Sequence, residues 1–202
     1  MSVLKKIVTS NKIFFSILLS FYLVGALLIF LVPKEVMHIR INKFNSAWAD
    51  VFFQYFTEVG SGVTVALVVV ILFFFDKRLA FSVGLSALFA GLVIQGLKHL
   101  VFPDIMRPSA VIHNLHLVEG VVLNKMYSFP SGHTSTAFAM FSTLVFYFRR
   151  KRLKLLFLFL ALLVGFSRIY LSQHFFVDVY FGSMIGLFFS ILFYVILLKD
   201  KL

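Results

Sequence analysis

The sequence predicts an all-α fold, a bundle of six transmembrane helices with an amphipathic helix in the membrane interface. Of the 202 residues, 61% are hydrophobic and 28 are Phe, whereas a soluble domain is closer to half apolar. Several apolar runs approach the roughly 20 residues that cross about 30 Å of hydrocarbon. Since no internal repeat or low-complexity linker is visible, we expect residues 1–202 to form a single domain.

The first apolar run follows a basic N-terminal segment and is too long for the apolar region of a signal peptide. It also lacks a small-residue cleavage site, so we expect a retained first helix. The second, fourth and fifth runs are short, and their predicted ends could move by a few residues. The six predicted spans are Ile13–Val32, Gly62–Phe75, Leu79–Leu97, Thr134–Phe148, Leu153–Phe166 and Val177–Leu198.

The positive charges predict the topology. With both termini in the cytoplasm, the cytoplasmic segments hold twelve Lys and Arg residues and the opposite side holds seven, as the positive-inside rule requires. The basic run Arg149–Lys154 is the strongest anchor, and we favour a topological role for it over lipid binding. Glycines in spans three and six are expected to permit close helix packing. They are Gly84, Gly91, Gly96, Gly182 and Gly186.

The opposite face then carries Pro33–Ser61, Lys98–His133 and Ser167–Phe176. In the first segment, apolar residues recur at helical spacing around Trp48, with polar residues between them. This pattern fits a helix lying in the interface with Trp48 at headgroup depth. It fits a helix packed on the bundle equally well.

Polar side chains gather in three clusters on this same face, at the ends of four predicted spans. Because polar residues near a membrane are costly, such clustering indicates function. Forked cationic donors match phosphate oxygens, and a Ser and a Gly at a helix start allow the backbone to approach an anion. The candidate phosphate-binding residues are Lys98, Arg107, Ser131, Gly132 and Arg168.

Two histidines and one carboxylate complete the set. His174 and Asp178 are four residues apart and share one face of a helix, where a carboxylate can hold one imidazole tautomer and leave the other nitrogen free to attack. His133, on another helix, can donate a proton to a leaving oxygen. His174, Asp178 and His133 are therefore the candidate catalytic residues.

These clusters resemble the signature of the type 2 phosphatidic acid phosphatase superfamily, whose pattern is a Lys before Arg-Pro, then Pro-Ser-Gly-His, then Ser-Arg with five residues to His and three more to Asp. PSGH at Pro130–His133 and SRIYLSQHFFVD at Ser167–Asp178 match in full. The resemblance covers about residues 60 to 190. One departure is the spacing between Lys98 and Arg107, which is eight residues instead of the usual six. Pro103 and Asp104 could form a bulge that compensates for it.

The resemblance implies a metal-independent hydrolase of lipid phosphates without a cofactor. His174 would form a phosphohistidine, Asp178 would orient it, and His133 would protonate the departing oxygen. The substrate would be a membrane lipid such as undecaprenyl pyrophosphate, phosphatidylglycerol phosphate, phosphatidate or lipid A. The expected location is the inner membrane, with the active site on the periplasmic or outer face; no nucleic-acid partner is expected.

Two other functions fit the same residues. A lipid phosphotransferase would use the same phosphohistidine, and a non-enzymatic anion-binding membrane protein would need the cations without both histidines. A metal site at His113 and His116 is disfavoured because both lie in a long loop without a helical pattern and the chain has no Cys. A haem between His133 and His174 is disfavoured because these histidines lie at helix ends beside three cations and not in mid-membrane among apolar residues.

Overall fold

The structure is a computed structural model that describes residues 2–201, and the described chain is built of helices and their connections. A long helix covers most of each of the six apolar runs. These helices are α2 (Lys12–Leu31), α5 (Gly62–Phe75), α6 (Lys77–Gly96), α8 (Gly132–Tyr147), α9 (Lys151–Tyr170) and α10 (Phe176–Leu198). The shorter elements are α1 (Val3–Ser10), α3 (Lys34–Asn42), α4 (Ala47–Phe56), α7 (Pro108–Val111), the 3₁₀ turns η1 (Thr57–Gly60) and η3 (Lys199–Lys201), and the π-helical turn η2 (Leu97–Val101).

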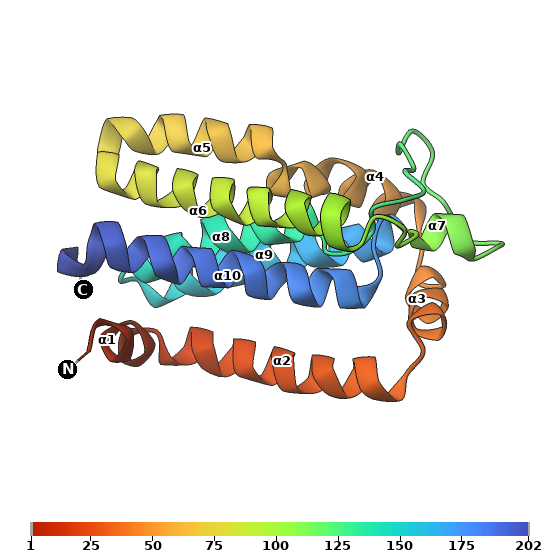
Figure 1. Cartoon of the computed structure of the whole chain (residues 1–202), viewed down its shortest axis with the longest axis horizontal. Helices are drawn as coiled ribbons and strands as arrows, with labels where there is room; N and C mark the ends of the chain where they lie inside the picture. Colours follow the sequence, from red (N-terminus) through yellow and green to blue (C-terminus); the bar gives the residue numbers. More distant parts are fainter. Residues whose placement is uncertain (1, 202) are drawn as a thin grey trace.

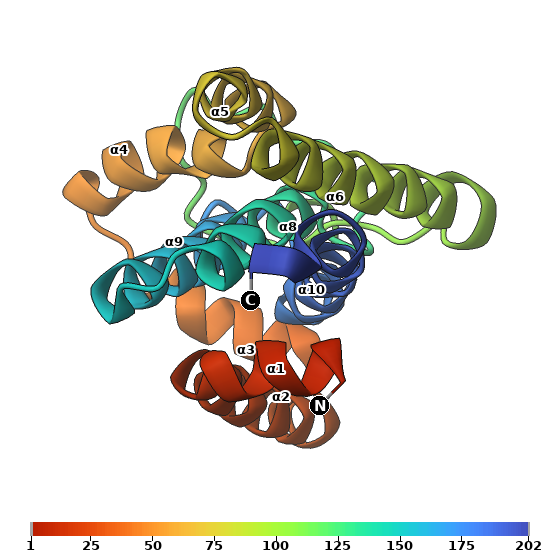
Figure 2. The same ribbon diagram turned by 90° about the vertical axis from the view of Figure 1, so that its left-hand side faces the viewer.

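Helix α8 is the centre of the bundle. It packs against α6, α9 and α10, and Figure 2 shows it enclosed by them. Twelve of its 16 residues are buried, among them Phe138 and Met140. Because α8 is surrounded by protein, it tolerates hydroxyl residues such as Ser142 and Thr143, which a lipid-facing helix would expose to hydrocarbon.

Both ends of the described chain lie at one end of the bundle, whereas α3, α4 and α7 lie at the other end (Figure 1). The long connection between α6 and α8 also lies at that second end. The helix ends that carry the three polar clusters therefore point in the same direction.

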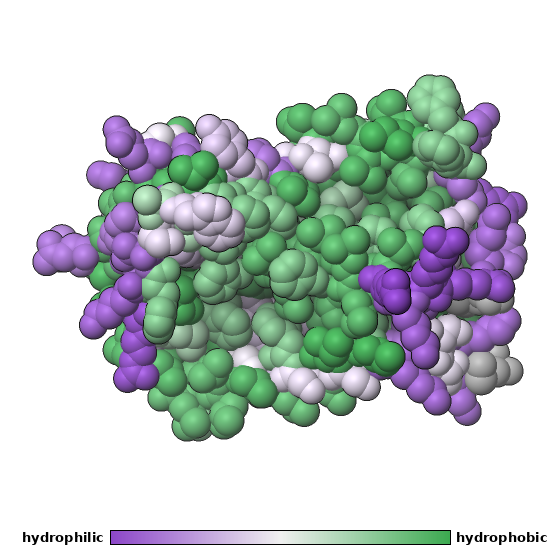
Figure 3. Space-filling model, turned by 180° about the vertical axis from the view of Figure 1, so that it is seen from behind, coloured by the Kyte–Doolittle hydropathy of each residue, from purple (hydrophilic) through white to green (hydrophobic). Residues whose placement is uncertain are grey.

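Among residues 2–201, four helices are long and apolar enough to cross a membrane: α2, α6 continued by η2, α9, and α10 continued by η3. The α4–η1 segment and α5 form a pair bent by 56° that would make a fifth. A broad hydrophobic belt separates two hydrophilic ends (Figure 3). The chain is thus a multi-pass membrane protein, while the count of six spans stays a prediction because α8 has only 16 residues.

Helix α4 packs on the bundle through one of its faces. Phe53 is buried against Tyr170 of α9, with ring centroids 4.6 Å apart. Trp48 and Tyr55 remain 73% and 72% exposed. One face of α4 therefore packs on the bundle and the other presents large aromatic side chains outward, which suits an interfacial environment.

The glycines of α10 permit the close helix packing that the sequence predicts. The packing of α6 does not require its glycines. A Cβ on Gly182 would lie 2.6 Å from the carbonyl oxygen of Ser131, and one on Gly186 would clash with the carbonyl oxygen of Ser135. By contrast, nothing lies within 4 Å of a Cβ added at Gly91. Small residues at the α8–α10 contact thus set how closely Ser131 approaches α10.

We expect Gly182→Ala to impair both stability and activity, because the added methyl group must displace the backbone of Ser131. Overpacking of this kind costs about 1–3 kcal/mol. The measurement compares thermal unfolding and turnover of Gly182→Ala with those of Gly91→Ala, which adds the same methyl group in open space. Equal stability and turnover in the two variants would contradict this view of the α8–α10 contact.

Candidate active site

His174 and Asp178 form a hydrogen-bonded pair where α9 is connected to α10. His174 Nδ1 lies 3.3 Å from Asp178 Oδ2. The same oxygen accepts the Ser128 hydroxyl at 2.5 Å and the Phe175 backbone N–H at 2.9 Å. Asp178 is the third residue of α10, from which a carboxylate can reach back to the N-cap amide. These bonds fix the carboxylate, so that His174 donates from Nδ1 and keeps Nε2 for other chemistry.

The imidazole of His174 is only 2% exposed. Burial lowers the pKa of His174 well below its usual value, and the nearby charges of Arg107, Arg168, Lys98 and His133 lower it further. Residues from four separate segments therefore act on one imidazole. At neutral pH this imidazole is neutral, which is the form that can act as a nucleophile.

The start of α8 is attached directly to this pair. Ser131 is the N-cap of α8, and its backbone N–H donates to the carbonyl oxygen of Asp178 at 3.0 Å. Its hydroxyl accepts a hydrogen bond from Thr134 at 2.9 Å. Gly132 and His133 form the first turn, where backbone N–H groups have no intrahelical acceptor. The PSGH motif thus meets the His–Asp pair at one helix junction.

Arg107 is held by the long connection and by the residue before His174. Its backbone N–H donates to the carbonyl oxygen of Lys125, and its Nε donates to that of Met126 at 3.0 Å. Its Nη1 donates to Gln173 Oε1 at 2.7 Å. Burial lowers the pKa of Arg107, but an arginine side chain remains charged in proteins.

Arg168, in the last turn of α9, organises the turn that carries His174. Its carbonyl oxygen accepts the backbone N–H groups of Gln173 and His174 at 3.0 and 3.1 Å. Its side chain is 8% exposed and donates from Nη1 to Thr57 Oγ1 at 2.8 Å. Its buried Nε has no hydrogen-bond partner among residues 2–201, so a donor is available for an additional acceptor.

Lys98 reaches the site despite the long spacing to Arg107. It lies in the π-helical turn Leu97–Val101, is 8% exposed, and its charge interacts with those of Arg107 and Asp178. Together with Arg107 it lines a cavity of about 440 Å³. The chain forms a turn at Pro103 and Asp104, where the sequence predicts a bulge, and the π turn that begins at Leu97 adds a second irregularity. A π turn of this kind redirects the side chains that it contains.

We expect Lys98→Gln to lower kcat/KM by about 10²–10³-fold, because a charged donor to the phosphate is lost. Lys43→Gln provides a matched control, since Lys43 is exposed in the connection between α3 and α4. Steady-state kinetics of purified variants checks the difference. Parent-like kcat/KM in Lys98→Gln would exclude this residue from the site.

The charges of the site do not balance within the described chain. Lys98, Arg107 and Arg168 are buried cations, and Asp178 is the buried carboxylate beside them. Buried charges are normally paired. The cluster lacks about two negative charges, which is the charge of a phosphate monoester near neutral pH.

Three residues that contact the site were not singled out from the sequence. Ser128 binds Asp178, Gln173 binds Arg107, and Thr57 binds Arg168. Ser128 and Gln173 are near motif residues in sequence, but Thr57 is 111 positions from its partner, and no local pattern could have indicated it.

Two other histidines at this end, His116 and His38, have structural contacts. His116 Nε2 lies 2.9 Å from Asp50 Oδ2, and His38 Nε2 lies 3.1 Å from Ser172 Oγ. Burial lowers the pKa of His38 to about 4. Within the part of the chain that the structure describes, no group of three or more His, Cys, Asp or Glu residues is arranged to hold a metal ion.

Known proteins include solved structures that are similar to this chain. A comparison with curated proteins gave no significant match. Among solved structures, the chain is similar to the crystal structure of Aquifex aeolicus LpxE, with 28% sequence identity and a TM-score of 0.70, over 78% of this chain and 92% of that one. It also shares the fold of the first transmembrane PAP2 type phosphatidylglycerolphosphate phosphatase from Bacillus subtilis, with 22% identity and a TM-score of 0.59, over 89% and 93% of the two chains.

The model of the PAP2 superfamily matches residues 79–201. This range contains Lys98, Arg107, the PSGH motif and the His174–Asp178 pair. The chain therefore belongs to the PAP2 superfamily.

Proposed function

We propose that this protein is a membrane lipid phosphatase that hydrolyses a phosphate monoester or pyrophosphate on a lipid through a phosphohistidine at His174. The observation that carries the proposal is the unbalanced cluster of buried cations, Lys98, Arg107 and Arg168, around a neutral histidine. Such a cluster stabilises a dianionic phosphate and the charge that develops during transfer of its phosphoryl group.

The proposed reaction has two steps. His174 Nε2 attacks phosphorus while Asp178 stabilises the imidazolium through Nδ1–H, and the bond from phosphorus to the lipid oxygen breaks. His133, protonated once the negatively charged phosphate is bound beside the cations, donates its proton to that oxygen. Water then attacks the phosphohistidine, His133 takes up its proton, and inorganic phosphate leaves. The phosphate oxygens are held by the three cations, with the Ser131 and Gly132 segment at the start of α8.

An apolar cavity beside the site supports a lipid substrate. It has a volume of about 450 Å³ and lies between α2 and the helices α9 and α10. Figure 3 shows that the hydrophobic surface on this face is hollowed. Phe176, two residues after His174, contributes to its lining. We propose that a lipid tail lies here while the phosphate reaches His174 from the membrane surface.

We further propose that residues 1–202 form one domain with six spans, that both termini lie in the cytoplasm, and that the site lies on the outer face of the inner membrane. Because the cations supply the charge stabilisation, the reaction should proceed in the presence of a chelator.

The test is phosphate release by purified protein from undecaprenyl pyrophosphate, phosphatidylglycerol phosphate, phosphatidate and lipid A, with chelator present. We expect release from at least one of them. Since no acceptor lipid is added, this release also separates a phosphatase from a phosphotransferase. If all four lipids bind without releasing phosphate, and the phosphoryl group appears on a second lipid when one is supplied, the phosphotransferase is correct. Binding without turnover under either condition would favour an anion-binding protein.

A further inference from the structure

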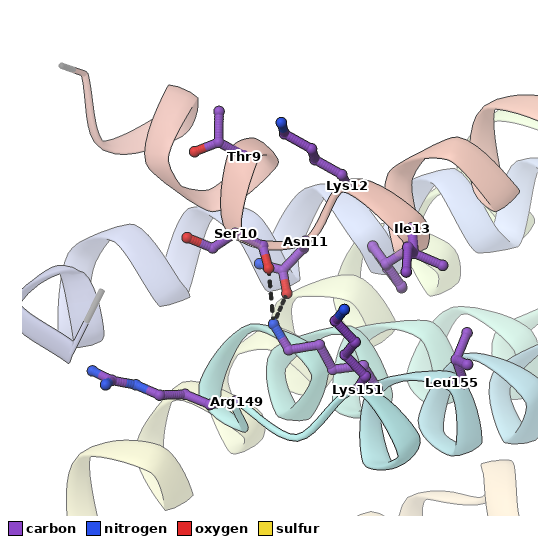
Figure 4. Close-up of a pocket in the computed structure, with 10 residues that line it drawn as sticks. Thr9, Ser10, Asn11, Lys12, Ile13, Arg149, Lys151 and Leu155 are labelled. Carbon is purple, nitrogen blue, oxygen red and sulfur yellow. Dashed lines mark hydrogen bonds between the residues drawn. The ribbon is translucent and has the colours of Figure 1, made fainter.

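Another cavity, distinct from the two described above, lies at the end of the bundle opposite the active site. Its volume is about 320 Å³, and it lies where the α1–α2 junction meets the start of α9. Figure 4 shows the two segments facing each other, with Lys151 extending from α9 toward the junction at Asn11. None of the proposed catalytic steps uses this cavity.

The lining is strongly basic. Lys12, Arg149, Lys151 and Lys154 contribute to it, and no Asp or Glu is among the described residues that line it. Lys154 joins the two walls through its Nζ, which donates to the carbonyl oxygen of Ser10 at 3.0 Å and also to Asn11 Oδ1. These acceptors are neutral, so the charge of Lys154 is not compensated.

The carboxylates at this end of the bundle are paired elsewhere. Asp200 Oδ2 lies 2.5 Å from Arg78 Nη1, and Asp76 Oδ2 lies 3.4 Å from Lys201 Nζ. They are therefore engaged with cations that do not line the cavity. The cations of the cavity lack an anionic partner within the described chain.

The cavity is also apolar on one side. Ile13 and Leu155 line it and are 50% and 44% exposed on the hydrophobic helices α2 and α9. Phe14 lies beneath them and is 3% exposed. A cationic wall next to apolar side chains at a membrane-facing helix end matches an amphiphile, because a free anion gains nothing from the apolar side.

We propose that this cavity binds the phosphate headgroup of an anionic phospholipid, with the first part of an acyl chain along Ile13 and Leu155. The bound lipid joins the α1–α2 junction to the start of α9 across the gap where Lys154 already bridges them. This site is separate from the active site and does not depend on the proposed catalytic function.

The test uses photolabelling in nanodiscs of phosphatidylcholine. The probe is phosphatidylglycerol with a diazirine in the upper acyl chain, and the same diazirine in phosphatidylcholine is the lipid control. As a phosphodiester, the probe has no terminal phosphate for the active site to remove. We expect the anionic probe to label residues 9–14 and 149–155, mapped after chymotryptic digestion.

The variant Arg149→Gln/Lys151→Gln should lower this labelling at least about fivefold, since each basic residue near an anionic headgroup strengthens binding by about that factor. The matched control is Arg150→Gln/Arg152→Gln, which removes the same charge from the same exposed run but not from the cavity. Thermal unfolding of both variants confirms that they fold.

Labelling that falls equally in both variants would indicate general surface attraction and overturn the proposal. Unchanged labelling in both, or equal labelling by the phosphatidylcholine probe, would also overturn it. The final measurement repeats the photolabelling in the presence of 10 mM inorganic phosphate. Complete protection by phosphate alone would show a site for a free anion instead of a lipid, whereas persistent labelling supports the lipid.

Discussion

His174→Ala protein is expected to release no phosphate above background from any lipid that the parent hydrolyses, a loss of at least about 10⁴-fold. The reason is that Nε2 of His174 is the proposed attacking atom and that its neighbour Asp178 cannot replace it in that position. Phosphate release by purified protein measures the effect.

The control is His113→Ala, which removes an exposed imidazole from the long connection at the same end of the bundle. It should retain parental turnover. Thermal unfolding separates loss of chemistry from loss of fold, because the backbone N–H of residue 174 still donates to Arg168 in the variant. Folded His174→Ala protein with parental turnover would exclude the phosphohistidine mechanism.

The second large effect is expected for His133→Asn, and its size should depend on the leaving group. With a lipid alcohol as leaving group, turnover should fall by about 10²–10⁴-fold, because general acid catalysis contributes that much. An aryl phosphate has a leaving group that needs no proton. In His133→Asn protein, an aryl phosphate should therefore still phosphorylate His174. Hydrolysis of the phosphohistidine then becomes the slow step.

Rapid-mixing kinetics tests this expectation. His133→Asn protein should release about one equivalent of phenolate per protein in a burst, followed by slow turnover. Thr136→Ser, a conservative change one turn further along α8, is the control and should show no burst beyond that of the parent. Equal losses for lipid and aryl substrates, without a burst, would contradict the role of His133 as an acid.

The motifs of the candidate site could be predicted from sequence because each is local. PSGH lies at one helix start, and His174 and Asp178 are one helical turn apart. The charge asymmetry and apolar run lengths then indicated that their ends share one face, and the structure brings them together. The ranges of the long helices could be predicted for the same reason, since the length of an apolar run is a local property of the sequence.

What could not be predicted depends on irregular backbone and on distant partners. Lys98 and Arg107 are separated by the π-helical turn η2, and the residues Leu97–Val101 carry no pattern that predicts this geometry. The partnership of Thr57 and Arg168 arises from packing of η1 against α9. Helix α8 was predicted as a membrane span from hydropathy, yet its burial reflects its position at the centre of the bundle.

The proposed mechanism requires transfer of a phosphoryl group to His174 among cations from separate helix ends. The most direct measurement quenches His133→Asn protein in alkali during its first turnover of a labelled aryl phosphate and locates the phosphate by mass spectrometry. We expect about one phosphate per chain on His174. Label on another residue, or a completed first turnover with no phosphorylated protein, would contradict it.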